Sequence, residues 1–108
     1  MERRKFLKGA ALGAAGTALA APAVAQSNAT TMTIVSTWPR DFPGLGVSAQ
    51  RLASRITELS DGAIQTEYFA AGERVGALDV FDEVASGNSQ AYIGADYYWT
   101  GKHPALAY

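Results

Sequence analysis

Two kinds of hydrophobic periodicity alternate along the chain, and one of them predicts three strands. Residues 32–38 form a continuous apolar and β-branched run, which predicts a buried strand that Pro39 ends because proline cannot donate to a ladder. Residues 63–69 alternate between polar side chains and apolar or hydroxyl-bearing ones, which is typical of a strand with one solvent-exposed face. Residues 89–96 form the third run, and an aromatic loop follows at residues 97–104.

The two segments between these strands have helical spacing. The first runs from Gly46 to the Asp61-Gly62 turn, and its apolar residues are expected on one buried face: Val47, Ala49, Leu52, Ala53, Ile56 and Leu59. The second covers residues 76–86 and has a shorter apolar stripe: Leu78, Phe81, Val84 and Ala85. Gly62 and Gly87 end the two segments, because glycine readily adopts the left-handed conformation that follows a helix.

The order strand, helix, strand, helix, strand predicts the α/β class, with a mainly parallel sheet and right-handed crossovers. Three strands and two helices can cover only part of the two faces of a doubly wound sheet. We therefore expect residues 26–108 to be the N-terminal part of a longer protein, in which the last strand leaves an open edge.

Residues 1–25 have the composition of a secretory signal peptide. A basic head precedes 13 weakly apolar residues, 9–21, and small side chains follow at Ala23 and Ala25. As a helix, the apolar stretch would be only about 20 Å long, which is shorter than a bilayer core of about 30 Å. An amphipathic helix of the domain is disfavoured because the stretch has no polar face. We expect a removable export signal, cleaved after Ala25 or, as a second choice, after Ala23.

The basic head also indicates a route of export. Residues 3–8 read Arg-Arg-Lys-Phe-Leu-Lys and resemble the twin-arginine signal, although Glu2 departs from the Ser or Thr that usually precedes the arginine pair. Residues 1–25 carry a net charge of +3, whereas residues 26–108 carry −4. The export machinery is thus an expected partner, and the mature protein is expected in the periplasm.

Composition excludes several classes of protein. Apolar residues make up 48% of the chain, and the net charge is −1. Burial of apolar surface therefore stabilises a folded chain by more than charge repulsion destabilises it, and a disordered chain is excluded. The chain has no cysteine, which excludes disulfides, thiolate metal sites and a cysteine nucleophile. The chain also has no basic patch of the kind that binds nucleic acid.

The residues that could carry out catalysis do not form a recognisable constellation. His103 is the single histidine of the chain and has no Asp or Ser spaced for a triad. Asp79, Asp82 and Glu83 fit the wet face of a helix better than a metal site. The glycines in residues 44–46 match neither a dinucleotide fingerprint nor a phosphate loop. We expect no catalytic residue, no metal site, no cofactor and no enzyme activity in this segment.

Aromatic residues gather where the predicted strands end. Ligands of parallel sheets bind outside the carboxyl ends of the strands. These ends carry Trp38, Arg40, Asp41 and Phe42 after the first strand and Tyr97, Tyr98 and Trp99 after the third. The first helix begins at the same edge, where its free N–H groups would favour an anion. We therefore predict a ligand wall of Trp38, Phe42, Tyr97, Tyr98 and Trp99, with packing against another part of the protein as the alternative for each aromatic.

Tyr98 is the favoured hydrogen-bond donor within this wall. If the third strand continued this far, Tyr97 and Tyr98 would point to opposite faces, and only one of them could face a ligand.

Three stretches carry a resemblance to a known family. Residues 71–75 read Ala-Gly-Glu-Arg-Val, residues 77–87 continue the pattern, and residues 97–105 read Tyr-Tyr-Trp-Thr-Gly-Lys-His-Pro-Ala. Together they resemble the extracytoplasmic solute receptors of TRAP transporters (the DctP-type family) over residues 31–108. The resemblance is strongest to the branch for 2-oxo acids and related monocarboxylates, in which an aromatic pair, a Trp and a Gly-Lys-x-Pro loop are typical.

The resemblance implies a periplasmic-binding-protein-like fold of two α/β domains, of which this segment forms part of the first. Such a receptor closes on an organic carboxylate and delivers it to TRAP membrane permease subunits driven by an ion gradient. In the family an Arg binds the carboxylate, and in this branch a cation accompanies the ligand. Neither the Arg nor the cation ligands can be assigned to residues of this sequence. The alternatives are a receptor of an ATP-driven importer and a periplasmic α/β enzyme.

The export signal gives a first prediction. Replacing Arg3 and Arg4 by Lys should leave the precursor in the cytoplasm, because the twin-arginine route depends on the arginine pair. Immunoblotting of periplasmic and cytoplasmic fractions measures the outcome. A normal level of mature protein in the periplasm would show that the general secretory route is used instead.

Overall fold

A computed structural model describes residues 28–108, and the proposed signal peptide in residues 1–25 lies outside the described residues. The described part contains seven elements in chain order: β1 (Thr30–Ser36), α2 (Leu45–Leu59), β2 (Ile64–Phe69), α3 (Val80–Ala85), β3 (Ala91–Ile93) and the 3-10 helices η2 (Asp96–Trp99) and η3 (Pro104–Ala107). None of the helices in this part is long and apolar enough to cross a bilayer.

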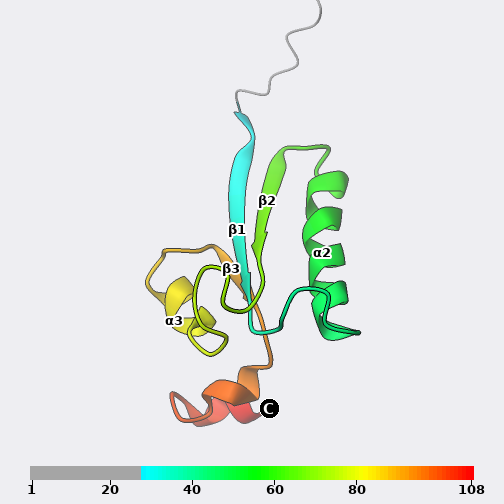
Figure 1. The fold of residues 1–108 in the computed structure, drawn as a ribbon. Coiled ribbons are helices and arrows are strands. Elements are labelled where there is room, and N and C mark those ends of the chain that lie inside the picture. The colour runs from blue at the N-terminus through cyan, green and yellow to red at the C-terminus, as the bar shows by residue number, and fades with distance from the viewer. Residues whose placement is uncertain (1–27) are drawn as a thin grey trace, which may run out of the picture.

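The three strands form one sheet in the order β2-β1-β3 (Figure 1). Both pairings are parallel, and Ile34 in the central strand lies opposite Tyr68 of β2 and Ala91 of β3. The predicted α/β class with a mainly parallel sheet is confirmed. The central position of β1 means that the chain crosses first to one side of this strand and then to the other.

Both faces of β1 are buried. Side chains alternate between the faces of a strand, and Ile34 and Val35 are each almost inaccessible. On one face Val35 forms a core with Val80 and Trp99. Partly buried apolar side chains surround this core: Phe69, Val75, Phe81, Val84, Tyr92 and Leu106. Helix α2 lies beside β2, and α3 lies on the other side of β1 (Figure 1).

The outer edge of β2 is covered by hydroxyl groups from α2 and from the turn that follows it. The N–H of Thr66 donates to Thr57 Oγ1 at 3.1 Å, and the N–H of Ile64 donates to Ser60 Oγ at 3.0 Å. Thr66 Oγ1 in turn donates to the carbonyl of Ala53 at 2.8 Å. The first two bonds satisfy N–H groups of β2 that a second chain could otherwise pair with.

The buried face of α2 is narrower than its apolar spacing predicts. Gly46, Ala49 and Ala53 are buried, but three residues expected on the same face are exposed: Val47, Leu52 and Leu59. The small side chains at 46, 49 and 53 let the helix approach the sheet closely. The larger apolar residues therefore lie beside the contact instead of in it, and the broad predicted stripe is wrong at these three positions.

The second helix and the third strand are shorter than predicted. Helix α3 begins at Val80, which is fully buried, whereas Leu78 precedes the helix and is exposed. Strand β3 ends at Ile93, because the chain then turns as a 3-10 helix that brings Trp99 back into the core. The predicted continuation of this strand to residue 96 is therefore wrong.

The turn after β3 requires a glycine at 94. A Cβ there would lie 2.6 Å from Thr37 Oγ1 and 3.0 Å from the Trp99 ring. We predict that Gly94→Ala destabilises the complete gene product by about 1 to 3 kcal/mol, because the ring or the strand end must move. Urea unfolding measures the change.

Gly101→Ala provides a matched control for this substitution. A Cβ at residue 101 would meet nothing within 4 Å. The unfolding free energy of this variant should be higher than that of the wild type, by no more than about 1 kcal/mol. Equal effects of the two substitutions would contradict the packing described around Gly94.

Candidate functional site

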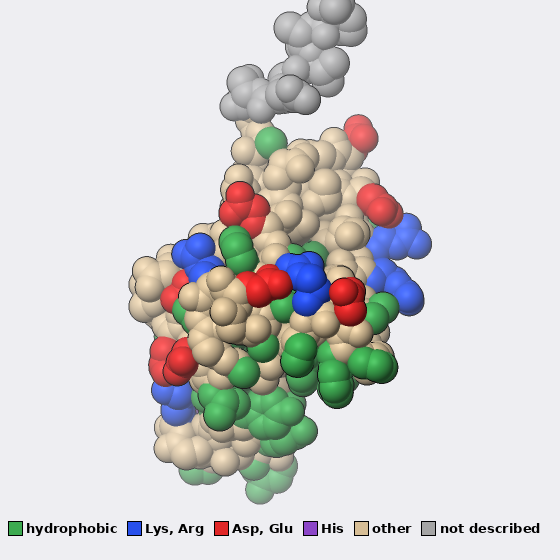
Figure 2. Space-filling model, viewed as in Figure 1, with side chains coloured by type: hydrophobic (Ala, Val, Ile, Leu, Met, Phe, Trp, Pro, Cys, Tyr) green, Lys and Arg blue, Asp and Glu red, His purple; other side chains and the backbone are tan. Residues whose placement is uncertain are grey.

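The candidate site lies at the carboxyl edge of the sheet, where the loops after the three strands meet. The chain leaves β1 toward β2 on one side, and β3 returns to the other side of β1, so the strand order reverses there. The Thr37 N–H donates to the Ile93 carbonyl at 3.0 Å and joins the ends of the two strands. Figure 2 shows apolar side chains gathered at this end of the molecule.

The loop between β1 and α2 carries two of the predicted wall residues. Trp38 is half-buried, its N–H donates to Ser36 Oγ at 3.1 Å, and its carbonyl accepts the Ala71 N–H at 3.0 Å. Phe42 is exposed near the start of α2. Both residues therefore lie at the predicted edge, and Trp38 is tied to the loop that follows β2.

The other three wall residues lie in the 3-10 helix η2. Trp99 is 4% exposed, and its indole N–H donates to the Leu78 carbonyl at 2.9 Å. Tyr97 and Tyr98 are 62% and 40% exposed, and their rings meet edge to face at 4.7 Å. Trp99 thus belongs to the core in the described residues, whereas the two tyrosines present their surfaces to solvent.

The argument from strand alternation does not apply to the two tyrosines, since β3 ends at Ile93. Successive residues of a 3-10 helix point about 120° apart, so Tyr97 and Tyr98 diverge without facing opposite sides of a sheet. A side-chain hydrogen bond with Tyr98 raises the pKa of Tyr97 above its usual value. The Tyr97 phenol therefore stays protonated at neutral pH.

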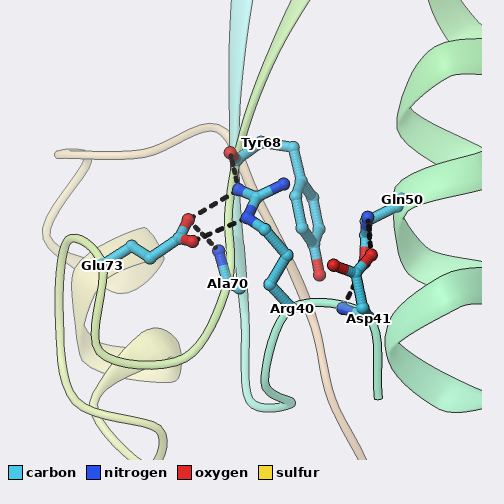
Figure 3. Close-up of polar contacts among 6 residues, drawn as sticks. All are labelled: Arg40, Asp41, Gln50, Tyr68, Ala70 and Glu73. Atoms are coloured by element: carbon cyan, nitrogen blue, oxygen red, sulfur yellow. Dashed lines mark hydrogen bonds and ion pairs between the residues drawn. The ribbon is translucent and has the colours of Figure 1, made fainter. Parts of the chain in front are cut away.

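Arg40 is held by a carboxylate of the chain itself (Figure 3). Its Nε and Nη2 donate to the two carboxylate oxygens of Glu73, each at 2.7 Å. Nη2 also lies 3.3 Å from the Tyr68 carbonyl, and the guanidinium lies over the Tyr68 ring at 5.4 Å. The sequence pattern indicated Arg40 at this edge but missed its partner. Because its Nε and Nη2 already donate to Glu73, this side of the Arg40 guanidinium is not free to bind a ligand carboxylate.

Glu73 is strongly stabilised as a carboxylate. The hydrogen bonds from Arg40, and next the Ala70 N–H at 2.8 Å, lower the pKa of Glu73 to about 2. The group therefore stays ionised throughout the physiological range.

The first turn of α2 is occupied by the loop that precedes it. The Leu45 N–H donates to the Pro43 carbonyl at 3.0 Å, and the Val47 N–H donates to the Phe42 carbonyl at 3.1 Å. The expectation of free donors at this helix end is therefore wrong for these two groups. The Pro39 carbonyl lies where a Cβ at Gly46 would be, so the loop and the helix are in close contact.

Three of the titratable side chains considered in the sequence analysis make local contacts. His103 Nδ1 accepts the Ala105 N–H at 3.1 Å and caps η3. Asp82 pairs with Lys102 at 2.6 Å. Glu83 pairs with Arg74 at 2.8 Å, and this hydrogen bond lowers the pKa of Glu83.

The chain is similar in sequence to a monocarboxylate 2-oxoacid-binding periplasmic protein of Nostoc. The two are 33% identical over an alignment that covers the whole chain and 31% of the relative. The chain thus spans about a third of the length of this curated relative. No family model matches it.

The fold is similar to that of TRAP periplasmic solute-binding proteins. One, from Pseudoalteromonas atlantica with bound sodium and pyruvate, matches with a TM-score of 0.68 and 32% identity, over 72% of this chain and 24% of that protein. Another, from Colwellia psychrerythraea with bound calcium and pyruvate, has the same TM-score and coverage at 29% identity. The resemblance to TRAP solute receptors and the periplasmic-binding-protein-like α/β fold are confirmed.

The cations in these two structures raise the question whether this chain could hold one. Among residues 28–108, no three His, Cys, Asp or Glu side chains cluster in a way that could bind a metal ion. The described residues therefore do not fit a cation site by themselves.

The Arg40–Glu73 pair gives a prediction for pH. A lowered pKa means that the pair contributes stability above the ordinary Glu value near 4.5, and that this contribution is lost as the pH falls toward 2. The difference in unfolding free energy between wild type and Glu73→Gln should therefore be constant above about pH 5 and shrink below it.

A carbon NMR titration of the Glu73 carboxyl measures the same effect directly. The signal should remain mostly that of the carboxylate at pH 3, and Arg40→Gln should shift the titration back toward ordinary values. A wild-type midpoint near 4.5 would contradict the ion pair.

Proposed function

We propose that this chain is part of a periplasmic solute receptor of a TRAP-type secondary transporter. The receptor captures an organic monocarboxylate, a 2-oxo or 2-hydroxy acid, and delivers it to membrane permease subunits. The observation that carries this proposal is the match, at a TM-score of 0.68, to solute-binding proteins whose structures contain pyruvate. The Nostoc relative, named for binding monocarboxylate 2-oxoacids, supports the same ligand class.

The proposed organisation follows from the sequence. Residues 1–25 form a twin-arginine signal peptide, and residues 26–108 belong to the first of two α/β domains. Periplasmic location is supported by the basic head with its short apolar stretch, and by the relatives, which are named as periplasmic proteins.

The ligand wall at the carboxyl edge divides into one donor, apolar walls and a support. Tyr98 and Tyr97 both present exposed rings, and the Tyr98 hydroxyl is our choice for the hydrogen bond to a ligand oxygen. Trp38 and Phe42 form the apolar side across the edge. Trp99 supports the tyrosines from the core, because its ring stacks edge to face on Tyr98 at 5.9 Å.

The carboxylate of the ligand is proposed to bind an arginine outside the described residues, as the resemblance to TRAP receptors implies. A free arginine would bind it through two parallel hydrogen bonds, and Arg40 is already committed to Glu73. A cation associated with the ligand is proposed on the same basis, since two similar proteins contain sodium or calcium together with pyruvate. Since no cluster of His, Cys, Asp or Glu in residues 28–108 could hold a metal ion, its protein ligands are proposed to lie outside the described residues.

Ligand binding would close the receptor by a population shift. A ligand that contacts both domains favours the closed state by the difference between its affinities for the two states. Closure around a hinge then presents one conformation to the permease.

Catalysis is not part of this proposal. A receptor of an ATP-driven importer is an alternative, and neighbouring genes distinguish the two: two permease subunits without an ATPase support the TRAP assignment. A periplasmic α/β enzyme is the other alternative, and turnover of bound pyruvate by the complete gene product would demonstrate it.

The hydroxyl groups of the two tyrosines provide the test of the site. Tyr98→Phe should weaken pyruvate binding by about tenfold to a hundredfold, because a hydrogen bond to a charged group is worth about 1.5 to 3 kcal/mol. Isothermal calorimetry of the complete gene product with pyruvate and with lactate measures this change.

Tyr97→Phe is the matched control, since it removes the neighbouring hydroxyl and keeps the ring. It should change the Kd by less than about twofold, or roughly 0.4 kcal/mol. If neither variant exceeds twofold, the aromatic turn has a packing role and the site assignment fails, while the receptor assignment stands.

A further inference from the structure

The Arg40–Glu73 ion pair joins two loops that are 33 residues apart in the chain. Arg40 belongs to the loop between β1 and α2, and Glu73 belongs to the loop after β2 (Figure 3). Two parallel hydrogen bonds of 2.7 Å fix the relative orientation of the guanidinium and the carboxylate, which a single contact would not do.

Each partner of the pair is also attached to its surroundings. Glu73 accepts the Ala70 N–H at 2.8 Å, so the carboxylate is fixed to the end of β2. Arg40 contacts both the carbonyl and the ring of Tyr68. The pair is therefore more than an isolated surface contact, for which little net stabilisation would be expected.

The same loop is attached to α2 on its other side (Figure 3). The Asp41 N–H donates to Gln50 Oε1 at 2.7 Å, and Gln50 Nε2 donates to Asp41 Oδ1 at 3.0 Å. Asp41 adopts a left-handed conformation with φ of 60°, which is costly for a residue other than glycine and needs such support. The loop is thus held from β2 through Arg40 and from α2 through Gln50.

Two residues of the proposed ligand wall lie within this doubly held loop. Trp38 precedes Arg40 by two positions, and Phe42 follows Asp41 directly. A wall that is already ordered before the ligand arrives loses less conformational freedom on binding, which increases affinity.

We propose that Arg40 and Glu73 are positioning residues for ligand binding: their ion pair holds the loop between β1 and α2 so that Trp38 and Phe42 line the site. This inference rests on the proposed function. It assigns to Arg40 a role through the loop, and not direct contact with the ligand carboxylate.

The test uses Glu73→Gln in the complete gene product, with Glu58→Gln as the matched control. Both substitutions remove the charge of a glutamate paired with an arginine, but the Arg55–Glu58 pair lies within α2 and touches neither loop. We expect Glu73→Gln to raise the Kd for pyruvate about tenfold and Glu58→Gln to change it less than twofold. Arg40→Lys, which keeps the charge but loses the fork, should give an intermediate loss and serves if Glu73→Gln does not fold.

A double-variant comparison separates positioning from a general effect on stability. If Glu73 acts through the loop, Phe42→Ala should cost less affinity in the Glu73→Gln background than in the wild type, because the ring is already misplaced. If Glu73 only stabilises the fold, the fold-losses in affinity caused by Phe42→Ala and by Glu73→Gln should multiply in the double variant.

The outcomes distinguish this inference from the function on which it rests. Equal Kd values for Glu73→Gln and Glu58→Gln, or losses that multiply in the double variant, overturn the positioning role while the receptor function stands. If the wild type binds neither pyruvate nor any other 2-oxo or 2-hydroxy acid, the proposed function fails, and the positioning role fails with it.

Discussion

Burial of Trp99 against Val35 and Val80 is the contact on which the candidate site depends. The indole must return to the face of the central strand, so β3 ends after three residues and the chain coils into a 3-10 helix. The indole N–H is satisfied by the Leu78 carbonyl, which fixes the segment before α3 as well. One buried side chain therefore ends a strand, anchors a loop and leaves Tyr97 and Tyr98 at the surface.

The opposite side of the edge is organised by polar contacts. The loop after β1 is not part of the core formed by Val35, Val80 and Trp99. It is held by a forked ion pair, by the exchange of hydrogen bonds between Asp41 and Gln50, and by close approach to Gly46. Exposed ion pairs usually stabilise proteins little, but contacts that fix orientation at several points can restrict a loop without adding much stability. The two sides of the candidate site are thus ordered by different physical means.

The similarity to TRAP solute-binding proteins fits this division. The chain spans about a third of the Nostoc relative and about a quarter of each similar structure. The described part supplies aromatic surface and phenols at the edge of the sheet, but Arg40 there is paired with Glu73, and no cluster of His, Cys, Asp or Glu in residues 28–108 could hold a metal ion. A ligand that bridges two domains needs complementary groups on each. In the proposed receptor, an aromatic wall on one side and charged partners on the other would make ligand binding depend on closure.

The sequence by itself predicted the class of fold, which the structure confirms, and it indicated the carboxyl edge of the sheet as the candidate site. Local periodicity is enough to predict the alternation in β2, the helical spacing of α2 and the order of the elements. The aromatic runs at the strand ends are also visible without a structure. Local patterns also produced the errors: apolar residues at 47, 52 and 59 match a helical stripe equally well, and only packing against the sheet selects the small residues at 46, 49 and 53.

Tertiary structure alone decided which of the edge residues are available to a ligand. The sequence does not distinguish Trp99 from the two tyrosines that precede it, since all three are aromatic. In the structure the Trp99 ring is buried in the core, and the two tyrosine rings are exposed. Arg40 and Glu73 are 33 positions apart, and no local pattern relates them. Their pairing arises because the carboxyl ends of neighbouring parallel strands meet at one edge, which is a consequence of the fold and not of spacing along the chain.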